Sequence, residues 1–98
     1  MSRYVFITYG SEEPTQRVMD AWMAWFAEIA DSVVDRGAPL GPGREVTPTG
    51  ARDLPTGADA ATGYTVVEAE SMAAAAKLLE RCPIITSVRV YEAMQMEG

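Results

Sequence analysis

The chain has 98 residues, 8 basic and 14 acidic side chains and a formal net charge of −6, which suits one domain spanning residues 1–98. The acidic balance excludes the usual kind of nucleic-acid partner, because phosphates require clustered lysine and arginine. The absence of histidine and the presence of one cysteine, Cys82, exclude a cysteine-based zinc site and an intramolecular disulfide. We therefore expect neither a metal nor a cofactor.

The first predicted element is a strand at residues 4–9, a short apolar run that ends at Gly10. A long amphipathic helix follows, in which apolar side chains recur at three- and four-residue steps. Gly37 is well placed as the left-handed residue that ends this helix, with Pro39 beyond it as a stop. The predicted apolar face consists of Val18, Trp22, Trp25, Phe26, Ile29 and Val33.

The middle of the chain carries weaker signals. Residues 44–47 predict a short second strand, bracketed by Pro42 and Pro48, which restrict it to a sheet edge or to its own ends. Residues 49–62 are rich in glycine, proline, threonine, aspartate and alanine, and this composition predicts a mobile surface loop.

The clearest unit is a strand followed by a helix with both ends of the helix marked. Residues 64–69 begin with aromatic and β-branched side chains, which favour a strand. Ser71 is a natural N-cap, and Pro83 ends the helix predicted over residues 72–82. Residues 87–94 alternate as a last strand does, and we expect residues 95–98 to fray.

The predicted order is therefore β-α-β-β-α-β. With right-handed crossovers, this order gives an α+β, ferredoxin-like fold, in which a four-stranded antiparallel sheet carries two helices on one face.

The strand faces predict a homodimer. In the first strand Val5 and Ile7 oppose Tyr4 and Phe6, so both of its faces are apolar. A solvent face alternates with charged residues, and the third and fourth strands carry only an occasional charge. A second sheet that covers the outer face explains this pattern; the alternative is that tyrosine and threonine tolerate partial exposure.

Several segments resemble the YCII-related family, which is related to proteins named for an Asp-Gly-Pro-Phe motif. The likeness covers residues 4–92 and depends on the order and spacing of its pieces. They are residues 22–26, 35–41, 63–71, 81–83 and 88–92.

The resemblance implies a dimeric α-β barrel, in which two ferredoxin-like sheets face each other and a pocket lies between sheet and helices. Some members of the wider family carry a His–Asp pair proposed as catalytic, with the histidine on the first helix. Here that helix offers Trp22 and Trp25 and no histidine. The Asp-Gly-Pro-Phe motif is also missing from residues 49–62, where we would expect it.

Candidate ligand-binding residues are few. Trp22 and Trp25 either wall an aromatic pocket or belong to the core, as tryptophans at helical spacing usually do. Arg44 either holds a ligand carboxylate through its guanidinium fork or is a solvated residue of an edge strand. Cys82 lies at a helix C-terminus, where no dipole lowers the pKa of a thiol, so we expect it to pack and not to react.

One carboxylate is a candidate catalytic base. Glu68 lies in an apolar strand on the same face as Tyr64, whose hydroxyl would orient a substrate. A covered position would raise the pKa of Glu68 towards the working range of a base. The alternative is an interfacial ion pair with Arg89, which would also be a candidate ligand-binding residue.

Three functions remain open. The first is a homodimer of the YCII-related kind that binds an unidentified small molecule. The second, by analogy with the wider superfamily, is a cofactor-independent isomerase, lyase or oxygenase. The third is an interaction module without a ligand. The chain shows neither a leader nor an apolar run long enough to span a bilayer, so we expect a cytoplasmic protein without a membrane partner.

Overall fold

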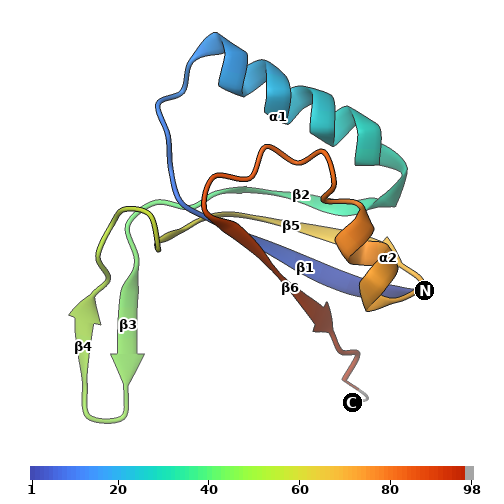
Figure 1. The fold of residues 1–98 in the computed structure, drawn as a ribbon. Helices are drawn as coiled ribbons and strands as arrows, with labels where there is room; N and C mark the ends of the chain where they lie inside the picture. Colours follow the sequence, from blue (N-terminus) through green and yellow to red (C-terminus); the bar gives the residue numbers. More distant parts are fainter. Residues whose placement is uncertain (97–98) are drawn as a thin grey trace.

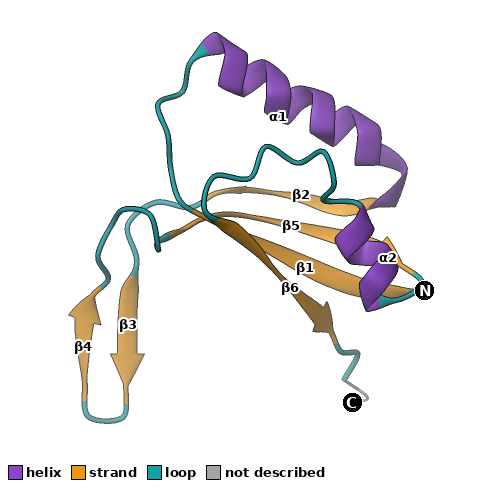
Figure 2. Cartoon of the chain, viewed as in Figure 1, coloured by secondary structure: helices purple, strands orange, loops and turns teal. Residues whose placement is uncertain are grey.

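The computed structural model describes residues 1–96 and is an α+β fold with a four-stranded sheet (Figures 1 and 2). The sequence predicted one domain over residues 1–98 with a frayed tail at residues 95–98. Residues 97–98 lie outside the described residues. The elements are β1 (Ser2–Tyr9), α1 (Gln16–Ile29), a 3-10 turn (Ala30–Ser32), β2 (Val33–Pro39), β3 (Arg44–Thr47), β4 (Gly50–Asp53), β5 (Ala61–Ala69), α2 (Met72–Lys77) and β6 (Ser87–Ala93).

The four-stranded sheet has the order β2-β5-β1-β6, and every neighbouring pair is antiparallel. Strand β1 is central, and Val5 pairs with Val66 of β5 on one side and with Tyr91 of β6 on the other. An antiparallel four-stranded sheet with two helices is what the sequence predicted, and the arrangement is consistent with a ferredoxin-like fold.

The second strand of the sheet lies earlier in the chain than predicted. Helix α1 ends at Ile29, and Val33 begins strand β2 where the sequence predicted helix. The prediction was wrong because Val33 is four residues beyond Ile29, so helical periodicity includes it by coincidence. Val33 packs against the core all the same, since it pairs with the buried Val67.

Gly37 therefore lies in an irregular strand and not at a helix end. The pairing of β2 with β5 shifts register twice, once between Val33 and Asp35 and again between Asp35 and Ala38. Gly37 has φ of 73°, a conformation that side chains with a Cβ disfavour. Its backbone N–H donates to Asp35 Oδ1 at 2.8 Å, which holds the bend in place.

Residues Arg44–Thr47 form a strand, as predicted, but they pair with β4 and not with the main sheet. Strand β4 occupies part of the segment that was predicted to be a loop. The two strands form a hairpin with Thr47 opposite Gly50, so only Pro48 and Thr49 connect them. The two strands of the hairpin pair only with each other, and residues 33–39 form the fourth strand of the main sheet.

The core lies between one face of the sheet and both helices. From the sheet come Tyr4, Phe6 and Val67, which are at most 4% exposed. Residues of α1 and residues at and just beyond α2 complete the same cluster, so both helices cover one face, as predicted. Their buried members are Trp25, Ile29, Ala75, Leu79 and Cys82.

Helix α1 packs against the core through residues of the predicted apolar face. Trp25 and Ile29 are its buried residues, whereas Trp22 and Phe26 are only partly buried against the core. Thr15 caps the helix, because its hydroxyl accepts a hydrogen bond from the Val18 N–H at 3.2 Å. The centre of the packed face thus lies at Trp25.

Helix α2 begins as predicted and ends earlier than predicted. The Ser71 hydroxyl accepts from the Ala74 N–H at 3.0 Å, which confirms the N-cap. The α-helix stops at Lys77, and tighter turns with three-residue bonds continue the chain to Cys82. Trp25 of α1 donates its indole N–H to the Leu78 carbonyl at 2.8 Å, so α1 satisfies a carbonyl at the end of α2.

Candidate functional site

The sheet face that carries no helix is the largest candidate surface, and we call it the outer face. Side chains that point away from the helices alternate with the core residues along each strand. Between residues 1 and 96 no helix has both the length and the hydrophobicity to cross a membrane. The outer face comprises Arg3, Val5, Ile7 and Tyr9 of β1, Tyr64, Val66 and Glu68 of β5, Arg89, Tyr91 and Ala93 of β6, and Asp35 and Ala38 of β2.

The middle of the outer face is apolar. One cross-strand row joins Asp35, Val66, Val5 and Tyr91, and the next joins Ala38, Tyr64, Ile7 and Arg89, so most of the apolar and aromatic side chains lie on the central strands β5 and β1. The side chains on these central strands are half-buried by their neighbours within the sheet, whereas Tyr91 is 52% exposed. The strand alternation predicted from sequence is therefore correct, and this face lacks the polar pattern of a water-facing sheet.

The charges of the outer face lie around its apolar centre. Arg3 and Glu68 pair across β1 and β5 at one end, with a nitrogen–oxygen distance of 3.9 Å. Arg89 lies towards the other end, with its guanidinium 4.6 Å from the centre of the Tyr9 ring. With Asp35 the face holds two arginines and two carboxylates, so its charges balance although the chain carries −6.

Glu68 is on the outer face with Tyr64, as predicted, and its side chain is 47% exposed. Its ionic neighbour in the chain is Arg3, not Arg89. Arg89 is opposite Ile7, four residues along β1 from the Arg3 position, so the predicted pair does not form within one chain. The separation of Glu68 and Arg89 depends on the register of β5 and β6 on β1, which the sequence alone does not define.

The two tryptophans lie on the other side of the sheet. Trp25 is 2% exposed and packs against Phe6 with ring centres 6.3 Å apart. Trp22 meets Trp25 edge to face at 5.8 Å and is half-buried. Both therefore pack in or against the core and do not join Tyr64 and Arg89 in one site.

Arg44 is at the base of the β3–β4 hairpin, away from both groups. Its Nη2 lies 3.0 Å from Asp53 Oδ1, and its Nε donates to the same oxygen at 3.0 Å. Two exposed side chains in an ion pair of this kind contribute little to stability. The guanidinium is already engaged by a carboxylate of its own chain, so the alternative of a solvated strand residue fits its position.

A shallow groove runs along the boundary between α1 and β2, with a volume of about 430 Å³. Arg36 stands at its edge with the guanidinium 4.7 Å from the centre of the Phe26 ring. Sequence reasoning missed Arg36, because the residues around it were assigned to the helix end. The lining residues are Met23, Phe26, Ala27, Ala30, Val33 and Arg36.

Cys82 is buried, and this burial raises the pKa of its thiol to about 12. The predicted packing role fits this environment, since the thiolate is the reactive form of cysteine. No group of acidic or sulfur ligands within residues 1–96 is arranged to hold a metal ion.

Comparisons of the chain with protein-family models, with curated proteins and with solved structures gave no match. We therefore infer the function from the geometry of the outer face.

Proposed function

We propose that this protein is a homodimer that binds a small organic molecule, with the outer faces of two protomers packed against each other. This is the dimeric α-β barrel that the resemblance to the YCII-related family implies. The observation that carries the proposal is the apolar centre of the outer face, which nothing in the chain covers within residues 1–96. Contiguous apolar surface of this kind is typical of interfaces.

The charge distribution supports a second copy of the chain as the partner. Two protomers of charge −6 repel each other over most of their surface. The outer face is the exception, because its arginines and carboxylates balance. In a face-to-face dimer the two-fold axis lies in the plane of the interface, and an axis that runs across the strands exchanges the two ends of the face, which brings Glu68 of one protomer towards Arg89 of its partner.

The ligand would lie on the same face. Once the face is covered, the Arg89 guanidinium, which has five N–H donors, can bind a ligand carboxylate in addition to Glu68 of the partner protomer. Tyr9 and Tyr64 add hydroxyl groups beside apolar side chains, a combination common in small-molecule sites. An organic compound with a carboxylate suits these groups. The core on the helix side is filled by side chains such as Phe6 and Val67, which favours the outer face over a pocket between sheet and helices.

The test is the mass of the native protein in solution, measured by light scattering at micromolar concentration. We expect a mass twice that of one chain. The interface of such a dimer should bury on the order of 1,500 Å² or more of accessible surface. Val66→Lys places a charge in the centre of the outer face and should give a monomer. Met19→Lys, at a residue 50% exposed on α1, is the matched control and should leave the dimer unchanged. A folded native monomer at this concentration would contradict the proposal.

Native mass spectrometry of protein from its own host tests the ligand. A retained small molecule in the dimer is the expected result, and its loss in Arg89→Ala would assign it to the outer face. Glu68→Gln separates the remaining functions. A catalytic base would lose turnover of the identified compound with the dimer intact, whereas an interfacial charge would weaken the dimer.

A further inference from the structure

The β3–β4 hairpin is a separate unit that extends from the body of the protein. Every residue of both strands is exposed, and the hairpin forms its own two-stranded sheet. In the view of Figure 1, α1 lies above the main sheet and the hairpin extends below it. The hairpin leaves the sheet at the edge where β2 ends and β5 begins. The hairpin thus extends away from α1.

The dimensions of the molecule reflect this extension. The Cα radius of gyration is 14.8 Å, and the extents are 44 × 41 × 18 Å. A compact domain of about 100 residues has a radius of gyration of about 13 Å. The chain is therefore more extended than its length requires, and the hairpin is the segment that stands apart from the rest.

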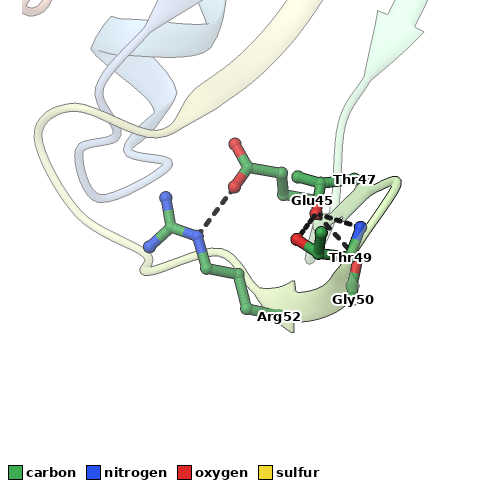
Figure 3. Close-up of polar contacts among 5 residues, drawn as sticks. All are labelled: Glu45, Thr47, Thr49, Gly50 and Arg52. Carbon is green, nitrogen blue, oxygen red and sulfur yellow. Dashed lines mark hydrogen bonds and ion pairs between the residues drawn. The ribbon is translucent and has the colours of Figure 1, made fainter.

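Polar contacts join the two strands of the hairpin, and Figure 3 shows those on one of its faces. Arg52 Nε donates to Glu45 Oε1 at 2.9 Å, and the Thr47 hydroxyl donates to the Gly50 carbonyl at 3.2 Å. Together with the pair of Arg44 and Asp53, these contacts neutralise all four charges of the two strands. The hairpin is thus uncharged overall in a chain of −6.

The other face of the hairpin presents an apolar side chain to solvent. Val46 is 75% exposed and lies opposite Ala51, next to the pair of Arg44 and Asp53. A two-stranded hairpin on its own is at best marginally stable in water. Such a hairpin, with an exposed valine and no net charge, would be stabilised by packing against another apolar surface. The main sheet of the same chain does not cover Val46.

We propose that the β3–β4 hairpin is an arm that packs against the second protomer of the dimer, with Val46 as its apolar contact. This inference rests on the proposed function, because it requires the outer faces to meet. The hairpin is connected to β2 by residues 40–43 and to β5 by residues 54–60, and both strands contribute to the outer face. Because it extends from the sheet on the side away from α1, it continues the same interface. Its neutral charge lets it approach an acidic partner without repulsion. Each protomer gives one arm and receives one, as two-fold symmetry requires.

The base of the arm makes a clean excision possible. Leu54 donates its backbone N–H to the Gly43 carbonyl at 2.9 Å, so the two ends of the hairpin already lie side by side. Replacing residues 44–53 with a two-glycine linker should therefore leave the body folded. Val46→Lys tests the same contact by one substitution at a side chain that is too exposed to affect the folding of one chain.

Sedimentation equilibrium gives the dimer dissociation constant of the native protein and of each variant. We expect excision and Val46→Lys each to raise it by about tenfold or more, as loss of a central contact does. Met23→Lys, at a residue 65% exposed on α1, is the matched control and should change it less than about twofold.

The outcomes separate the two proposals. If the native protein dimerises and both Val46→Lys and the excised form keep the native constant, the arm proposal is overturned while the sheet-to-sheet dimer stands. If the native protein is a monomer, both proposals fall. Circular dichroism of each variant confirms the fold, and if the excised form is unfolded, the result for Val46→Lys decides.

Discussion

Trp25→Phe is the most informative test of the core, because the substitution removes one hydrogen bond and keeps an aromatic ring. The indole N–H of Trp25 donates to the Leu78 carbonyl at 2.8 Å, next to the last turn of α2. Phenylalanine would leave this part-buried carbonyl unpaired, at a cost of about 1–3 kcal/mol. The smaller ring loses roughly another 1 kcal/mol of apolar contact. We expect a total loss of about 2–4 kcal/mol in the free energy of unfolding.

The assay is urea denaturation followed by far-ultraviolet circular dichroism, since tryptophan fluorescence changes with the substitution itself. The midpoint should fall with an unchanged slope, because the surface exposed on unfolding is the same. Trp22→Phe is the matched control at a half-buried residue of the same helix, and we expect a loss of less than about 1 kcal/mol. Equal losses in the two variants would refute the proposed link between α1 and α2.

Three further changes test the local structure. Gly37→Ala should lower the thermal midpoint more than Gly57→Ala does. A Cβ at residue 37 would overlap the Tyr64 carbonyl, whereas a Cβ at Gly57, which has φ of 121°, would face open space. Ser71→Ala should cost about 1 kcal/mol, because it removes the N-cap of α2, and a null effect in urea would exclude this role. Since burial raises the Cys82 pKa from 9.0 to about 12, its unfolded form ionises first and native stability should decline as pH rises above 9. Cys82→Ala should lose this part of the decline, and an unchanged pH profile would argue against it.

Local patterns predicted the types of most elements. The apolar run at residues 4–9, the strand at residues 64–69 and the Ser71 cap are all present, because each depends on neighbours within a few residues. The alternation of side chains also assigned Val5 and Ile7 to one side of β1, and Tyr64 and Glu68 to one side of β5, correctly. The same alternation predicted that a second sheet covers the outer face.

The failures concern which strands pair and in which register. Arg44–Thr47 has the composition of a strand, but composition does not state that its partner is β4 and not the main sheet. The position of Arg89 opposite Ile7 is likewise a matter of register between strands about 80 residues apart in sequence. The sequence therefore predicted individual candidate residues but not which of them lie next to each other.

Sequence by itself determined the strands β1, β3, β5 and β6, the presence of both helices, the apolar sides of β1 and the start of α2, because backbone preference, alternation and capping act over a few residues. Tertiary structure decided that α1 stops at Ile29, so that Val33 joins the sheet, and that the β3–β4 hairpin stands apart. Val33 suits the apolar face of a helix and the inner face of a strand equally well. Only pairing with the buried Val67 of β5 selects the strand, because that contact is made between segments that the chain brings together on folding.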